Sequence, residues 1–138
     1  DLYAGAGNLS LPLARAARSV VAVERDVAAM AAARAGAAEH GIANVAFHAM
    51  PVEEYFARHA GAPDLLVLNP PRTGVGDHAE RIAERRAPRI VYVSCNPPTL
   101  ARDAAVLTAR GYRLQRALPI DLFPQTCRVE TVCELLLT

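Results

Sequence analysis

A single cysteine at the end of a predicted strand is the residue of this sequence best placed for chemistry. Residues 89–95 are rich in β-branched and aromatic side chains, which is typical of a buried strand. Pro97 and Pro98 cannot continue a strand ladder, so the strand is predicted to end near Cys95. In open α/β sheets, ligands bind at that end of the strands. A lone cysteine is also commonly a small buried residue, so the rest of the chain has to decide between the two interpretations.

A Gly-x-Gly turn near the start of the chain and an acid one strand later form a second candidate site. Gly5 and Gly7 follow strand-like residues, and Asn8 can cap the helix predicted after them. Ser10 stands where the dinucleotide fingerprint has its third glycine. Glu24 ends the next strand, which is the usual position of an acid that binds ribose hydroxyls. The alternative is a tight strand-to-helix turn and a solvated charge.

A third polar residue, Asn69, follows a predicted strand at residues 64–68. Pro70 and Pro71 fix an extended backbone there, which would hold Asn69 pointing into a cleft. The three candidate positions thus all follow strands, at the edge of the sheet where ligands bind in α/β proteins.

The elements that position these residues alternate between strand and helix, as in an α/β domain. Asp26 is predicted to cap the second helix, and Gly41 to stop it. The last strand follows another strand without a helix between them, so it is predicted to run antiparallel. We expect one domain over residues 1–138, with strands at 19–24, 44–49, 64–68, 89–95, 112–119 and 128–137, and helices at 8–18, 26–40, 53–59, 75–86 and 99–110.

Composition indicates a globular chain, with 52% hydrophobic and 21% charged residues among 138. No apolar run approaches the roughly 20 residues of a membrane span, and the net charge of +1 argues neither for nor against nucleic acid. Cys95, Cys127 and Cys133 have no CxxC spacing, which argues against a zinc site or disulfide framework and favours a reducing cytoplasm. Residues 1–5 look like the end of a strand, so we expect a fragment of a longer chain.

Four motifs in this order resemble the catalytic domain of the S-adenosylmethionine-dependent RNA uracil C5-methyltransferases, which make 5-methyluridine in transfer and ribosomal RNA. The resemblance covers essentially the whole chain. The motifs are DLYAGAGN at 1–8, NPPRTG at 69–74, SCNP at 94–97 with TLARD at 99–103, and DLFPQT at 121–126 with VETV at 129–132. Asn69 stands where the family usually has Asp, and Arg128 where it usually has His.

The resemblance implies a Rossmann-like class I methyltransferase fold, with a mostly parallel seven-stranded sheet whose last strand is antiparallel and whose first strand is truncated at the N-terminus. It implies RNA as partner, no membrane and no metal, with Cys95 as nucleophile and Glu130 as general base. Arg72 and Asn96 are expected to bind substrate. The expected S-adenosylmethionine site consists of Asp1, Tyr3, Gly5, Gly7, Asn8, Glu24 and Asn69.

The implied chemistry explains why a thiol and a carboxylate are needed together. Carbon 5 of uracil is a poor nucleophile, and addition of a thiolate to carbon 6 makes it electron-rich. After methylation a base must remove the proton on carbon 5, a step that typically contributes about 10²–10⁴-fold. Only the fold can bring Cys95 and Glu130 together, and adjacent strand ends would do so.

Two alternatives remain from the sequence. The Asn69 loop also resembles the loop by which amino methyltransferases hold an exocyclic nitrogen, in which case Cys95 would be incidental. The chain could instead bind the cofactor, or serve assembly, without turnover on its own. Cys127 and Cys133 are expected to be structural.

Overall fold

The computed structural model describes residues 1–122, 124–126 and 128–138. They form two compact units, unit 1 (Asp1–His59) and unit 2 (Ala60–Thr138), and each is described by itself. Phe123 of the fourth motif and Cys127, which we expect to be structural, lie outside the described residues. A single domain over residues 1–138 stays a prediction.

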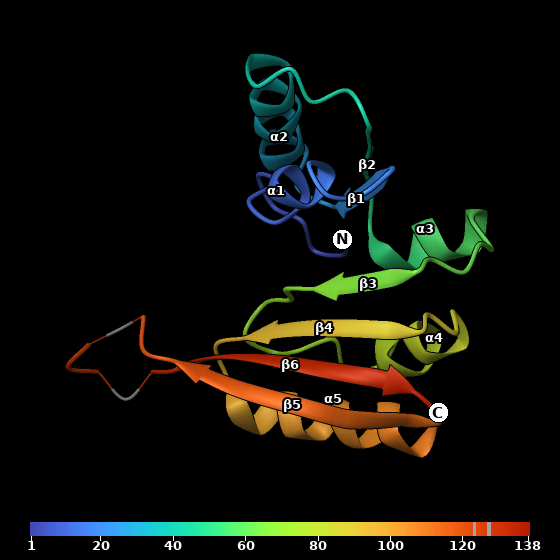
Figure 1. Cartoon of the computed structure of the whole chain (residues 1–138), viewed down its shortest axis with the longest axis vertical. Coiled ribbons are helices and arrows are strands. Elements are labelled where there is room, and N and C mark those ends of the chain that lie inside the picture. The colour runs from blue at the N-terminus through green and yellow to red at the C-terminus, as the bar shows by residue number, and fades with distance from the viewer. Residues whose placement is uncertain (123, 127) are drawn as a thin grey trace. The chain divides into compact units, whose positions relative to one another are not determined.

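Unit 1 is built on a parallel pair of strands with helices beside it (Figure 1). Its elements are α1 (Ser10–Ala14), β1 (Val20–Glu24), α2 (Val27–Glu39), β2 (Val45–Ala49) and α3 (Val52–Arg58). The register runs from Val20 opposite Val45 to Glu24 opposite Ala49. Before β1, a single parallel bridge joins Leu2 to Val23, so the residues that precede the Gly-x-Gly turn lie beside β1.

Helix α2 begins and ends where the sequence predicts. Asp26 caps it by accepting hydrogen bonds from the backbone N–H groups of Ala28 at 2.8 Å and Ala29 at 3.0 Å, and the helix ends just before Gly41. Its buried face packs on β1 through a small cluster of apolar side chains. That cluster contains Ala4, Ala22, Met30 and Ala33, with Val45 and Phe47 packed against it.

Helix α1 differs from the prediction at both ends. It was expected over residues 8–18 with Asn8 as its cap, but it spans Ser10–Ala14, and Leu9 is the N-cap residue without a side-chain hydrogen bond. Asn8 therefore does not cap α1, because residues 5–9 form turns that delay the first helical residue. At the other end, the Asn44 side chain donates to the carbonyls of Ala14 and Ala17 at 2.8 and 3.0 Å, which satisfies backbone groups that a longer helix would have paired internally.

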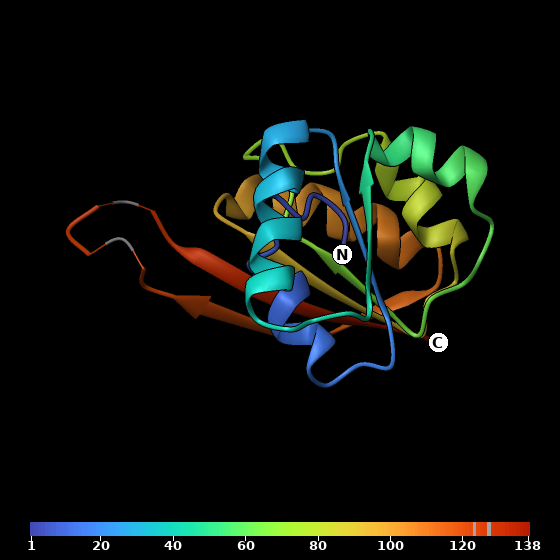
Figure 2. The ribbon, with the colours of Figure 1, turned by 90° about the horizontal axis from the view of Figure 1, so that it is seen from above.

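Unit 2 is a four-stranded sheet with two helices on one face (Figures 1 and 2). Its strand order is β3-β4-β6-β5. β3 and β4 are parallel, and β6 runs antiparallel to both of its neighbours, as predicted for the last strand. The elements are β3 (Leu65–Leu68), α4 (His78–Glu84), β4 (Arg89–Ser94), α5 (Pro97–Ala109), β5 (Tyr112–Ile120) and β6 (Glu130–Leu137).

The two faces of this sheet differ in burial. Along β4, Ile90 and Tyr92 are fully buried while the residues between them are half-buried, as expected when successive side chains point to opposite faces. Opposite them on β6, Leu135 and Cys133 are buried as well. These side chains form the core beneath α4 and α5, and Cys95 follows β4 at its carboxyl end, as predicted.

Helix α4 is shorter than predicted. The expected range was 75–86, and the structure has His78–Glu84. Gly76 has a φ of +53°, outside the helical region. Gly74, with a φ of +76°, departs from the helical region as well, so both neighbours of Val75 prevent a helix there. The backbone N–H of Val75 donates to the carboxylate of Asp103 at 2.8 Å. The remaining predicted elements match to within a few residues, and none of the described helices combines the length and apolar character needed to cross a bilayer.

Candidate active-site segments

The Gly-x-Gly turn of unit 1 is held by the acid at the end of β1. One oxygen of Glu24 accepts the backbone N–H of Gly5 at 3.0 Å, and the other accepts that of Asp26 at 2.9 Å. Glu24 is therefore fixed in orientation beside the turn. Each carboxylate oxygen can accept more than one hydrogen bond, so Glu24 keeps the capacity to accept from ligand hydroxyls.

The backbone of this turn has an unusual conformation at Tyr3. Its φ of +65° is rare for a bulky residue, and such strain persists where surrounding structure enforces it, often at ligand sites. A Cβ added to Gly7 would lie 3.1 Å from the Cβ of Ala33, so only glycine lets the turn pack this closely on α2. A Cβ at Gly5 would meet nothing within 4 Å, so one side of the turn is open.

Asp1 presents an incompletely satisfied carboxylate to the same turn. One oxygen accepts the hydroxyl of Ser10 at 2.5 Å. The other is buried and has no hydrogen-bond partner among the residues that the structure describes. A buried acceptor without a partner costs about 1–3 kcal/mol, and a bound donor would satisfy it. Together with the open side of Gly5, this fits a polar ligand at the turn.

The strand register of unit 2 brings the Cys95 and Glu130 segments together. The ladder between β4 and β6 runs from Arg89 opposite Leu136 to Ser94 opposite Thr131. The ladder ends there, so Cys95 follows the last residue of β4, and Glu130 is the first residue of β6. Because β4 and β6 are neighbouring strands, the register puts the two residues at adjacent strand ends.

The environments of these two side chains suit reaction rather than packing. Cys95 is half-buried and is not in a disulfide. Burial raises the pKa of the Glu130 carboxyl above its usual value near 4.5. Cys133, by contrast, is 3% exposed, and burial raises the pKa of its thiol, which disfavours the thiolate. Of the two described cysteines, Cys95 is the accessible one.

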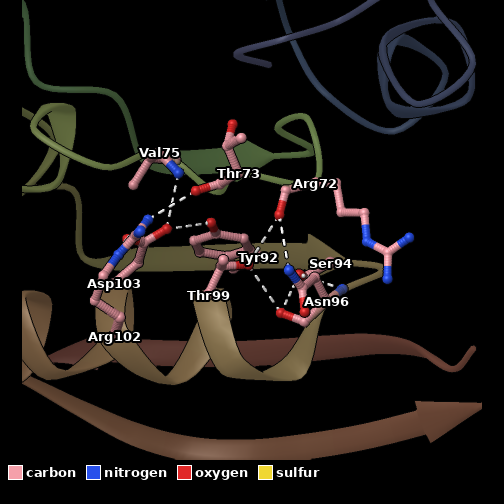
Figure 3. A network of polar contacts seen from close by, with 9 residues as sticks. All are labelled: Arg72, Thr73, Val75, Tyr92, Ser94, Asn96, Thr99, Arg102 and Asp103. Atoms are coloured by element: carbon pink, nitrogen blue, oxygen red, sulfur yellow. Dashed lines mark hydrogen bonds and ion pairs between the residues drawn. The ribbon is translucent and has the colours of Figure 1, made fainter.

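The loop after β3 and the turn after β4 are joined by hydrogen bonds (Figure 3). Asn69 and Arg72 are exposed in this loop. The side-chain amide of Asn96 donates to the carbonyl oxygen of Arg72 at 3.0 Å. The hydroxyl of Thr99 lies 3.2 Å from the same oxygen and 3.0 Å from the carbonyl oxygen of Asn96, and it shares its one hydrogen between these two acceptors. The residue next to Cys95 thus holds the backbone of the loop that carries Arg72.

Sequence reasoning missed the buried residue that completes this arrangement, Asp103 on α5. It is 1% exposed and accepts hydrogen bonds from the Val75 N–H and the Tyr92 hydroxyl, at 2.8 and 2.7 Å. A signal was present, because Asp103 lies at helical spacing between the buried residues Leu100 and Leu107. A charge on an apolar stripe is unusual unless it is paired.

The structure therefore brings some predicted site residues together within each unit. Unit 1 groups Asp1, Tyr3, Gly5, Gly7 and Glu24 around one turn, with the exposed Asn8 after it. Unit 2 groups Asn69, Arg72, Cys95, Asn96 and Glu130 at the carboxyl end of β4. No group of three or more potential metal ligands is found among the described residues.

Comparison with known proteins identifies the family of this chain. The family profile described as tRNA (Uracil-5-)-methyltransferase matches residues 1–138. The 23S rRNA (uracil(1939)-C(5))-methyltransferase RlmD of Pseudomonas putida is 46% identical over 96% of this chain and 30% of that protein. The RlmD protein of Hahella chejuensis is 44% identical over 96% of this chain and 31% of that protein. The chain thus spans about a third of the curated relatives it matches.

Solved structures agree with the fold. The Pyrococcus abyssi tRNA (uracil-54, C5)-methyltransferase in complex with S-adenosyl-L-homocysteine matches with a TM-score of 0.81 and 28% identity, over 99% of this chain and 33% of that chain. Magnesium protoporphyrin IX methyltransferase from Synechocystis PCC 6803 matches with a TM-score of 0.77 over 100% of this chain and 72% of that chain, at 17% identity, and supports the fold alone. The predicted Rossmann-like class I methyltransferase fold is confirmed.

Proposed function

Because the chain belongs to the tRNA (uracil-5-)-methyltransferase family, we propose that the protein containing it transfers a methyl group from S-adenosylmethionine to carbon 5 of a uridine in transfer or ribosomal RNA. We also propose that the protein acts in the cytoplasm, which the cysteine pattern of the sequence favours. The observation that carries this proposal is the β4–β6 register, which supports Cys95 and Glu130 acting on the same base.

Cys95 acts as the nucleophile in this reaction. Its sulfur adds to carbon 6 of the uracil, which makes carbon 5 electron-rich. The target base has to leave its stack to reach a thiol at the end of a strand. Once carbon 5 carries the methyl group, its remaining proton is removed and the carbon–sulfur bond breaks, which releases the product and restores the thiolate.

Glu130 removes the proton from carbon 5. A carboxylate with a raised pKa is a stronger base than an exposed one, because its ionised form is less well solvated. The exposed guanidinium of Arg72 and the Asn96 side chain bind the substrate, and Asn69 lies near the point of methyl transfer.

The turn of unit 1 holds the cofactor. Glu24 accepts hydrogen bonds from the ribose hydroxyls, as acids at this position do in Rossmann-like folds. The open side of Gly5 admits the ligand, and the unsatisfied oxygen of Asp1 accepts from one of its donors. Tyr3, Gly7 and Asn8 complete the site. S-adenosylmethionine, when bound, supplies the electrophilic methyl group.

Nucleoside analysis of the RNA product tests this proposal. The full-length protein should form 5-methyluridine, Cys95→Ala should form none, and Cys133→Ala should retain activity because that thiol is buried away from the site. Formation of 5-methyluridine by Cys95→Ala at the wild-type rate would refute the role of the thiol.

One observation favours a second candidate. Asn69 is exposed directly after β3 and follows the pattern of a loop that holds an exocyclic amino group. The same nucleoside analysis distinguishes the two, since a methyl group on nitrogen would support this alternative. A chain that binds S-adenosylmethionine in calorimetry but methylates RNA only as part of the full-length protein would identify residues 1–138 as a cofactor-binding part.

A further inference from the structure

We infer that Thr99 and Asp103 of α5 are positioning residues, which fix the loop at residues 72–75 and through it the Arg72 guanidinium. This inference rests on the proposed function and adds two residues to it. Neither residue touches the reacting atoms, and both would act through Arg72.

The first observation is the density of side-chain contacts to the backbone of this loop. Three backbone groups of this loop are bound by the N-cap residue Asn96 and by three residues of α5, and we call these four residues the α5 clamp (Figure 3). The carbonyl of Arg72 accepts from Asn96 and Thr99 at 3.0 and 3.2 Å, that of Thr73 accepts from Arg102 at 2.8 Å, and the N–H of Val75 donates to Asp103 at 2.8 Å.

The second observation is the satisfaction of the buried charge at the centre of the clamp. One oxygen of Asp103 accepts from Val75 and Tyr92, and the other accepts from Nε and Nη2 of Arg102 at 2.9 and 2.8 Å. A carboxylate that is 1% exposed is tolerated only with such partners. Asp103 therefore ties the loop to α5 and, through Tyr92, to β4, the strand that Cys95 follows.

The third observation is the fit of Gly74 against this carboxylate. A Cβ at Gly74 would overlap Oδ2 of Asp103, and Gly74 has a φ of +76°. The loop therefore packs so closely on the clamp that any residue larger than glycine at position 74 would displace it. Within the loop, the N–H of Gly74 donates to the carbonyl of Pro71 at 2.8 Å, and the clamp adds the contacts that hold this turn against α5.

The clamp binds the backbone of Arg72 and leaves its side chain exposed. Its carbonyl is held by two donors, while its side chain is exposed and extends away from the clamp in Figure 3. A flexible arginine aimed at substrate loses less entropy on binding when its backbone is already fixed. The clamp would thus determine how well Arg72 aligns the base with Cys95.

A double-mutant cycle in the full-length protein tests this coupling. Single-turnover rates of 5-methyluridine formation are measured for Thr99→Val, Arg72→Ala and the double variant, so that slow variants remain measurable. Thr99→Val removes the hydroxyl that the carbonyls of Arg72 and Asn96 share, and it should lower the rate about fivefold with Arg72 present. In the Arg72→Ala background the same change should cost less than about twofold, and Thr99→Ser should restore the rate.

Thr108→Val is the matched control. It removes a threonine hydroxyl from the same helix, but Thr108 donates to the carbonyls of Ala104 and Ala105 within α5 and not to the loop. Equal losses from Thr99→Val in both backgrounds, no loss at all, or an equal loss from Thr108→Val would overturn the inference. If the wild-type protein makes no 5-methyluridine, the proposed function itself fails and the positioning role fails with it.

An independent readout follows the loop directly. Asp103→Asn keeps the shape of the side chain but removes the charge that holds Arg102. Hydrogen exchange of peptides covering residues 72–76 should become faster in Asp103→Asn and stay unchanged in Thr108→Val. Unchanged exchange in Asp103→Asn would overturn the role of Asp103.

Discussion

The hydroxyl of Tyr92 offers a quantitative test of how the buried charge holds unit 2 together. Tyr92 is fully buried and donates to Oδ2 of Asp103 at 2.7 Å. Tyr92→Phe keeps the ring and its packing but removes this donor. Asp103 then keeps the N–H of Val75 on the same oxygen and Arg102 on the other.

The expected cost follows from the type of hydrogen bond that is lost. A bond to a charged group contributes about 1.5–3 kcal/mol, against about 0.5–1.5 kcal/mol for a neutral pair. Tyr112 provides the neutral comparison, because it is 3% exposed and donates to the carbonyl of Ala87 at 2.9 Å. Tyr92→Phe should therefore destabilise unit 2 more than Tyr112→Phe does.

Native-state hydrogen exchange measures this difference within the full-length protein, since it reports the opening free energy of each segment. Peptides from β4 should exchange about 10- to 100-fold faster in Tyr92→Phe. Tyr112→Phe should increase exchange of β4 less, and should leave exchange of residues 72–76 unchanged. Equal effects of the two substitutions, or the reverse order, would refute the view that Asp103 is the charged centre of this network.

Three further predictions follow from the site and the fold. Glu130→Gln should accumulate covalent protein–RNA adduct on denaturing gels. In the wild type, the acid limb of the pH–rate profile should lie above pH 4.5 because burial raises the pKa of Glu130, and a limb at or below pH 4.5 would contradict this. Because the folded state binds more protons than the unfolded state in that window, the free energy of unfolding should fall as pH rises through it. Asp26→Ala should destabilise α2 by about 0.5–2 kcal/mol by hydrogen exchange while Asp26→Asn costs only a few tenths, and equal costs would argue against the cap. Glu24→Gln should weaken S-adenosylmethionine binding about tenfold or more in calorimetry, and unchanged affinity would exclude the ribose contact.

Local signals in the sequence account for the elements that were predicted well. Pro97 and Pro98 mark the end of β4, because proline cannot extend a strand ladder. Asp26 marks the start of α2, because its side chain can accept hydrogen bonds from the first backbone N–H groups of a helix. These effects depend on neighbouring residues only, so the position of Cys95 at a strand end could be predicted without coordinates.

Helix boundaries set by distant residues could not be predicted. α1 ends early because Asn44, 30 residues after Ala14, takes up its carbonyl. Nothing in the local pattern of α1 carries that information. The late start of α4 has a local cause instead, because Gly74 and Gly76 have φ values of +76° and +53°, and the predicted range 75–86 did not allow for them.

Local sequence patterns likewise predict one part of the candidate site and not the other. The strand-end positions of Glu24, Asn69 and Cys95 follow from local patterns. The position of Cys95 and Glu130 at adjacent strand ends depends on the antiparallel register of β4 and β6. The sequence order of the two final strands supports that direction but not that register. The α5 clamp was visible only as an unexplained charge at Asp103, because its partners come from the loop and from β4.

The most direct test of the account is to locate the bond between protein and base. RNA in which 5-fluorouridine replaces uridine is incubated with the full-length protein and S-adenosylmethionine, and the adduct is digested and sequenced by mass spectrometry. Fluorine cannot leave as a proton does, so the covalent intermediate should persist, and the account predicts that the nucleotide is attached to the sulfur of Cys95. Attachment at Cys133 or another residue, or no covalent adduct with this RNA, would contradict the role of Cys95 as the nucleophile.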